Sequence, residues 1–156
     1  MSSKHEYRMY TFTNRLYMRD IQLGIQSLHA VAEMFIKYPM GTAEHEKMHT
    51  WAKDDKTVII LDGGNAASLA EIFRSIGAFC DNAEIPYAVF YEDMDSLGGV
   101  ITAVSVLVPA ELYKAQREDL TDDWTYVSED GTDVYYYPNN CEQSKFLTVL
   151  KSFRLA

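Results

Sequence analysis

Short apolar runs bounded by turn residues alternate with long segments of helical periodicity, and this alternation constrains the fold more than any other feature. Strand-forming residues occupy 7–13, 57–61, 87–91 and 100–108, and helical periods fill about 20–38, 43–53 and 65–85. Pro109 opens one more helix. The order βααβαββα predicts an α/β domain of three layers around a four-stranded mixed sheet, in which the strands at 57–61 and 87–91 form a parallel pair.

The last part of the chain has a different pattern. Two aromatic, strand-forming runs flank residues 128–131, which is typical of a hairpin, and Asn140 then caps a helix with apolar side chains on one face. A chain of 156 residues of which 47% are apolar is long enough to bury one core. We therefore expect a core domain at residues 1–120 and an extension at 121–156 that packs on it.

The charge balance is strongly acidic, because 14 Lys and Arg residues stand against 23 Asp and Glu residues and give a net charge of −9. Such a surface repels phosphate backbones and also keeps a protein in solution. No apolar run is long enough to cross a membrane or to serve as a signal peptide. Cys80 and Cys141 share no metal-ligand or disulfide pattern, so we expect free thiols and a cytoplasmic protein.

The first helix carries a polar stripe on an otherwise apolar sequence. Four polar residues recur at helical spacing, namely Gln22, Gln26, His29 and Glu33. The stripe is either the solvated face of an amphipathic helix or the lining of a site that binds carbonyl and hydroxyl groups. An acidic loop, residues 92–96, follows the third strand and precedes Thr102 on the fourth. Ligands of open α/β sheets gather beyond the carboxyl ends of strands, so this loop is a second candidate.

Residues 45–49 read His-Glu-Lys-Met-His and match the HExxH pattern of zinc peptidases. Two imidazoles one turn apart can hold zinc, and Glu71 is the carboxylate that could complete the site. The alternative is a solvated helix with surface histidines. Residues 62–65, Asp-Gly-Gly-Asn, lie between a strand and a helix, where they form either a tight turn or a small anion site.

Three stretches of the chain resemble the type 2 peptidyl-tRNA hydrolase family. Residues 14–18 and 24–30 resemble its first strand exit and its AAQ-x-x-HA helix, and 51–61 resemble its W-x-x-x-G-x-x-KVV segment. Residues 92–109 resemble its segment from D-x-G-x-T through PGT to a PA-E-L helix start. The resemblance covers about residues 7–115 and implies the same βααβαββα order.

The resemblance also implies an activity, which is hydrolysis of the ester between a peptide and the 3′ ribose of tRNA by a dimeric enzyme that needs no metal or other cofactor. Glu92 stands at the position of the family's catalytic aspartate, and Ser96 and Thr102 stand at its two threonines. Gln26 and His29 match the helix motif. Catalytic roles are therefore expected for Glu92, Thr102, Ser96 and His29, and substrate-binding roles for Gln22, Gln26 and Asp95.

The chain departs from the family pattern at two charged positions: Gln22 stands where the family has a lysine, and Asp95 where it has an arginine. The first hypothesis is a divergent peptidyl-tRNA hydrolase-like homodimer, of the kind that bacteriophage genomes carry, with a tRNA-linked substrate. The alternative is a catalytically lapsed binding module of the same fold that engages a protein partner or a small ligand, with the aromatic extension as a contact surface. The HExxH zinc peptidase is the third.

Overall fold

The computed structural model describes residues 6–16, 20–93, 99–114, 123–127, 134–138 and 142–156. The predicted α/β fold and its element order are confirmed. The elements are β1 (Tyr7–Thr13), α1 (Asp20–Lys37), α2 (Ala43–Thr50), a π-helical turn (Trp51–Asp55), β2 (Val58–Asp62), α3 (Ala66–Ala83), β3 (Tyr87–Tyr91), β4 (Ile101–Pro109), α5 (Ala110–Tyr113), β5 (Asp123–Val127), β6 (Val134–Pro138) and α6 (Glu142–Leu150).

The four-stranded sheet has the order β2-β1-β4-β3. β1 pairs in parallel with β2, and β4 runs antiparallel to both of its neighbours, so β1, β2 and β3 point the same way. The predicted parallel pairing of β2 with β3 is wrong, because β1 and β4 lie between them and α3 crosses the whole sheet. The continuous apolar run at 57–61 is also typical of a strand covered on both faces, but β2 is an edge strand and Val58 is 42% exposed. β4 is the buried strand instead.

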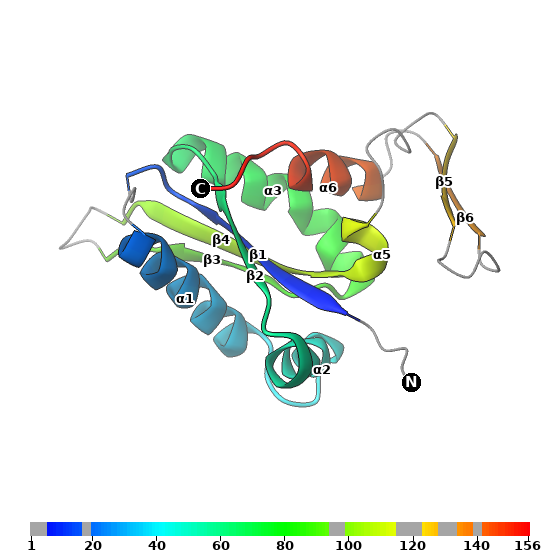
Figure 1. Cartoon of the computed structure of the whole chain (residues 1–156), viewed down its shortest axis with the longest axis horizontal. Coiled ribbons are helices and arrows are strands. Elements are labelled where there is room, and N and C mark those ends of the chain that lie inside the picture. The colour runs from blue at the N-terminus through cyan, green and yellow to red at the C-terminus, as the bar shows by residue number, and fades with distance from the viewer. Residues whose placement is uncertain (1–5, 17–19, 94–98, 115–122, 128–133, 139–141) are drawn as a thin grey trace.

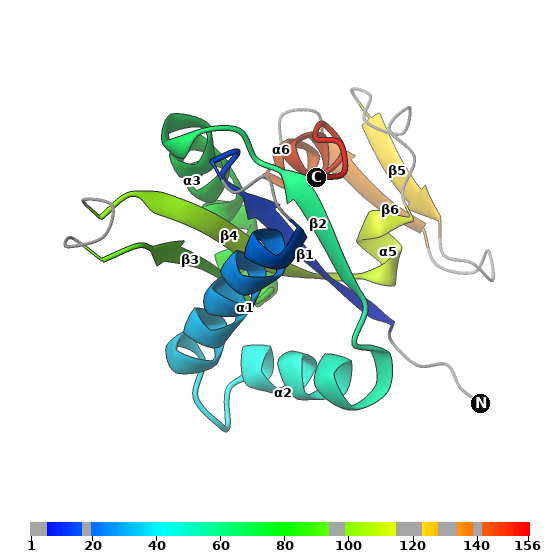
Figure 2. The same cartoon turned by 60° about the vertical axis from the view of Figure 1, so that its left-hand side comes forward.

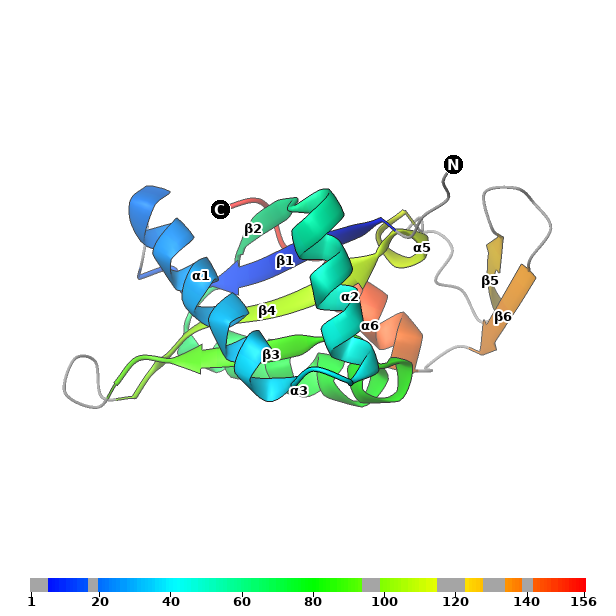
Figure 3. The ribbon, with the colours of Figure 1, turned by 90° about the horizontal axis from the view of Figure 1, so that it is seen from below.

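Helices cover both faces of this sheet, which gives the three layers (Figure 1). α1 and α2 lie on one face, and α3 and α6 lie on the other (Figure 3). The core below α1 and α2 is built from Tyr7, Met9, Val31, Met34, Tyr38, Met48, Ala88 and Leu107. The larger core below α3 and α6 includes Phe12, Leu69, Ile76, Val104, Val106, Phe146 and Leu147.

α6 belongs to the second of these cores, because the ring of Phe146 lies 5.0 Å from that of Phe79 on α3. After α6, Asp62 N donates to Arg154 O and Ala156 N donates to Ile60 O, both at 3.0 Å, so the segment lies along the outer edge of β2. β5 and β6 form a separate two-stranded sheet, which stands apart from the four-stranded one in Figures 1 and 3. Cys80 is buried and free, and burial raises the pKa of its thiol.

The side of α1 that packs on the sheet carries Gln26 and Ser27 together with the apolar Ala30, Val31 and Met34, which overturns the solvated-face interpretation of the polar stripe for Gln26. Gln26 is 2% exposed and Ala30 is fully buried, whereas Leu28 between them is 67% exposed. The physical reason lies in the strands below Gln26, where the buried side chains on this face are polar or small: Thr11, Thr102, Ser105, Ala88 and Ala103. A helix face of Gln26, Ser27 and Ala30 complements this floor, and larger apolar side chains would not fit as closely.

Candidate functional site

The candidate site lies at the edge of the sheet where β1, β2 and β3 end and β4 begins. The hydroxyl of Thr102 on β4 donates a hydrogen bond of 2.7 Å to Oε1 of Gln26 on α1. Both side chains are buried, at 0% and 2% exposed, and 76 residues separate them in the chain. Two residues that sequence analysis placed in one site are therefore in direct contact. Because the Thr102 proton goes to Oε1, the two protons on Nε2 of Gln26 remain for another acceptor.

Asn14 holds the start of β4 against the end of β1. Its Nδ2 donates to Ile101 O at 2.8 Å, its Oδ1 accepts from Leu16 N at 3.0 Å, and its backbone N donates to Thr102 O at 2.8 Å. Asn14 is 2% exposed, and its hydrogen bond to Ile101 O is buried. Sequence analysis did not include Asn14 among the site residues, although a lone Asn at a strand exit, next to the helix motif, is the signal that could have found it.

His29 lies one turn after Gln26 on the same side of α1. Its ring centroid is 4.6 Å from that of Phe90 on β3, and its Nδ1 is buried without a hydrogen-bond partner. The hydroxyls of Thr11 and Ser105, which face each other across β1 and β4, are likewise buried without partners. The floor below α1 thus holds unsatisfied polar atoms beside the Gln26–Thr102 pair, which is unusual for a purely structural helix contact.

Glu92 directly follows β3 at this edge. Its backbone N donates to Val100 O at 2.8 Å, which joins the two arms that lead into and out of the acidic loop. Its carboxylate is half-buried, and Oε1 accepts from Asp93 N at 3.4 Å. Gln22 is also half-buried and lies one turn before Gln26. Asp95 and Ser96 lie outside the described residues, so the structure does not place them.

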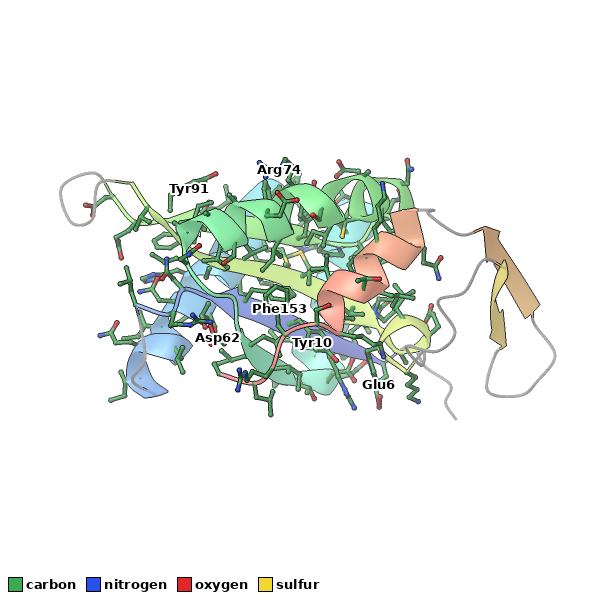
Figure 4. The ribbon with its side chains drawn as sticks, turned by 90° about the horizontal axis from the view of Figure 1, so that it is seen from above. Glu6, Tyr10, Asp62, Arg74, Tyr91 and Phe153 are labelled. Carbon is green, nitrogen blue, oxygen red and sulfur yellow. The ribbon has the colours of Figure 1, made fainter. Side chains whose placement is uncertain are left out.

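A cavity of about 200 Å³ opens between the end of β1 and the start of α1, and its lining includes Thr13, Asn14, Arg15, Leu23, Asp62 and Leu155. Arg15 Nε lies 3.3 Å from Asp62 Oδ2, and the Arg15 side chain is 65% exposed. Asp62 lies at this edge of the sheet, close to the start of α1 (Figure 4). Arg15 is therefore a cation at this cavity, beside the first turn of α1. Sequence analysis did not include Arg15 among the site residues.

The turn between β2 and α3 is stabilised by its own hydrogen bonds. Asp62 Oδ1 accepts from Gly64 N at 2.9 Å, and Gly64 has a φ of +84°, which favours glycine. Asn65 caps α3 in a reciprocal box with Ser68. A Cβ at Gly63 would lie 2.5 Å from Leu69 Cδ2, so this glycine allows the helix to pack closely. These contacts support the tight-turn interpretation of residues 62–65.

The HExxH residues do not form the expected metal site. His45 Nδ1 donates to Tyr38 O at 3.0 Å, and His49 is exposed on α2. Glu71, the expected third ligand, accepts hydrogen bonds from Arg74 and Ser75 on the surface of α3. Within the described ranges, no group of three His, Cys, Asp or Glu side chains is placed to hold a metal ion. The helix is short and mostly solvated, which fits the alternative of surface histidines.

Comparison of the sequence with protein-family models and with curated proteins found no match. Among the described helices, none combines the length and the apolar character that a membrane span requires.

Proposed function

We propose that this protein is a divergent peptidyl-tRNA hydrolase-like esterase of the cytoplasm, active as a homodimer on a tRNA-linked substrate. The observation that carries the proposal is the buried hydrogen bond of 2.7 Å between Thr102 and Gln26. These residues come from the two motifs that resemble the family, and the buried pair leaves the Nε2 group of Gln26 to bind a further acceptor. The location beyond the ends of β1, β2 and β3 is also where α/β sheets bind ligands.

The contacts suggest a different role in the reaction for each residue. Thr102 is a positioning residue, since its proton is used to hold Oε1 of Gln26. The Nε2 group of Gln26 then donates to the oxyanion that forms when the ester carbonyl is attacked. Glu92 orients a water and takes its proton, and His29 and Ser96 bind the substrate's polar groups or stabilise the same oxyanion. Gln22 and Asp95 contact the substrate outside this centre.

The reaction balances without a metal or an organic cofactor. Water attacks the carbonyl carbon of the ester, and Glu92 accepts the proton of that water. The bond between the carbonyl carbon and the ribose oxygen then breaks, and the ribose oxygen leaves with the proton from Glu92. The products are the 3′ hydroxyl of the tRNA and the carboxylic acid of the peptide, which ionises to the carboxylate by releasing its proton to water.

The test is hydrolysis of a labelled peptidyl-tRNA by the purified protein and its variants. Glu92→Gln removes the base and should lower kcat by about 100-fold or more. Thr102→Val should lower kcat by about 10- to 100-fold because Gln26 loses its orientation, and Thr102→Ser should restore most of the rate. Glu46→Gln is the matched control, since Glu46 is an exposed carboxylate on α2 and belongs to the HExxH pattern.

Equal turnover by Glu92→Gln and the native chain would remove Glu92 from the reaction. If only Glu46→Gln lost turnover, the catalytic carboxylate would be Glu46 on α2 and not Glu92. If the native protein shows no turnover at enzyme concentrations equal to that of the tRNA, the catalytically lapsed binding module becomes the better description.

A further inference from the structure

The outward side of α1 is an apolar stripe along its whole length. Ile21 is 75% exposed, Leu28 is 67% exposed and Ile36 is 75% exposed. Ile25, Ala32 and Phe35 are exposed on the same side. Figure 2 shows α1 at the front of the sheet, with this outer side facing away from the strands. Near its C-terminal end, the ring of Phe35 lies 6.1 Å from that of His45 on α2. We call these six residues the α1 stripe.

The spacing within the α1 stripe is that of a coiled-coil seam. Ile21, Ile25, Leu28, Ala32 and Phe35 follow one another at intervals of 4, 3, 4 and 3 residues. This is the alternation of a and d positions in a heptad repeat, whose side chains insert between those of a facing helix. The stripe therefore fits another helix better than it fits a flat surface.

We propose that the α1 stripe binds the α1 stripe of a second copy of this chain, with the two helices antiparallel and Leu28 near the two-fold axis. A series of d, a, d, a and d positions has the same alternation in both directions, so an antiparallel copy of α1 brings a matching seam. The contact is isologous and closes at two chains.

Local charge supports self-association although each chain carries a net charge of −9. The positions that flank the seam hold Gln22, Gly24 and His29 and contain no carboxylate. Charges elsewhere on the two surfaces are screened over about 8 Å at physiological salt. A basic partner would be expected to face acidic flanks, and α1 has none beside the seam.

The exposed area also suits a dimer. The exposed fractions of the stripe residues correspond to roughly 500 Å² of apolar surface, which is in the size range of the largest apolar patch on a monomer, a patch that is often functional. A standard interface buries about 800 Å² on each partner. The stripe would form the apolar centre of such an interface, and the residues around it would contribute the remaining area. Since Gln22 and His29 flank the seam, the second copy would lie beside the candidate site. The proposal does not depend on whether that site hydrolyses an ester.

Sedimentation velocity of the native chain from about 1 to 100 μM should show a dimer, because an apolar interface of standard size reaches micromolar affinity or better. Leu28→Glu should raise the dissociation constant by about 100-fold or more, since two leucines leave the interface and two carboxylates face one another. Leu155→Glu is the matched control: Leu155 is 69% exposed but lies on the edge of β2, so this variant should stay dimeric. Circular dichroism should show that both variants are folded.

Cysteine cross-linking tests the antiparallel arrangement. Leu28→Cys should form a disulfide-linked dimer under mild oxidation, because the two side chains meet at the axis. Ile21→Cys should not, because the two copies of residue 21 would be roughly 20 Å apart. A native chain that stays monomeric throughout the concentration range, or a dimer that Leu28→Glu leaves intact, overturns the proposal. Cross-linking through Ile21→Cys would overturn the antiparallel geometry.

Discussion

Thr102 on β4 and Gln26 on α1 form a buried hydrogen bond of 2.7 Å that links the first helix to the start of β4. Thr102→Val keeps the shape of the side chain but leaves Oε1 of Gln26 buried without a donor. We expect the free energy of unfolding to fall by about 1–3 kcal/mol. Thr102→Ser retains the hydroxyl and should lose only about 1 kcal/mol with the methyl group. Urea denaturation measures both.

A double variant separates the hydrogen bond from other effects of the substitution. Gln26→Leu combined with Thr102→Val removes both polar partners and should be more stable than Thr102→Val alone. If Thr102→Val were as stable as the native chain, the bond would not form in solution.

The positions of the strands and helices could be predicted from sequence because their signals are local. The strand at 87–91 has the predicted bounds, set by Pro86 before it and the acidic loop after it. α3 begins after the cap at Asn65. The order of strands could not be predicted in the same way, because it depends on pairing between segments far apart in the chain. A run such as residues 57–61 is apolar enough for a central strand, although it lies at an edge.

The orientation of α1 could not be predicted from the helix sequence for a related reason. Hydrophobicity favours burial of Ile21 and Leu28, but the side of the sheet below α1 carries hydroxyls and small side chains, which selects Gln26 and Ala30 instead. That information resides in β1 and β4, not in the helix. The same contact explains the site: the Gln26 and Thr102 motifs were predicted to meet, whereas Asn14 and Arg15 were overlooked because only the folded chain brings them to this edge.

Replacing each of two alanines on opposite sides of α1 with leucine tests this orientation. Ala30 is fully buried against the sheet, and Ala32 is exposed on the outer side of the same helix. Ala30→Leu should lower the free energy of unfolding by about 1–3 kcal/mol through overpacking. Ala32→Leu should change it by no more than about 0.5 kcal/mol when the protein is dilute enough to be monomeric. The reverse ranking would mean that the apolar side of α1 faces the sheet.

α6 should unfold together with the core. Phe146 is fully buried and contacts Phe79, so Phe146→Ala should lower the free energy of unfolding by about 3–5 kcal/mol. Leu155→Ala, at a position that is 69% exposed, is the comparison and should have a small effect. Circular dichroism and tryptophan fluorescence should report one transition for both variants. A separate early transition for Phe146→Ala would show that the helix is an independent appendage.

Tyr38 makes the fold sensitive to alkali. Its hydroxyl donates to Tyr87 O at 3.2 Å and accepts from Tyr87 N at 3.3 Å. Burial, as the largest cause, raises the pKa of Tyr38 from 10.0 to about 12. The pKa values of Tyr87 and Tyr113 are raised in the same direction, also chiefly by burial. Burial lowers the pKa of Lys37, and this shift has the opposite effect on how stability changes with pH. Lys37 is present in both the native chain and a Tyr38 variant, so its effect cancels when the two are compared.

Between pH 10 and pH 12 the unfolded chain releases the Tyr38 proton while the folded chain retains it. The unfolded state therefore binds fewer protons, and the free energy of unfolding falls as the pH rises through this range. Tyr38→Phe has no proton to lose at this position, so the slope of its stability against pH should be smaller by up to about 1.4 kcal/mol per pH unit. At pH 7 the variant should be less stable by about 1 kcal/mol because its hydrogen bonds to Tyr87 are gone. Urea denaturation at pH 8, 10 and 11.5 measures this change, and parallel stability curves for the variant and the native chain would contradict a raised pKa at Tyr38.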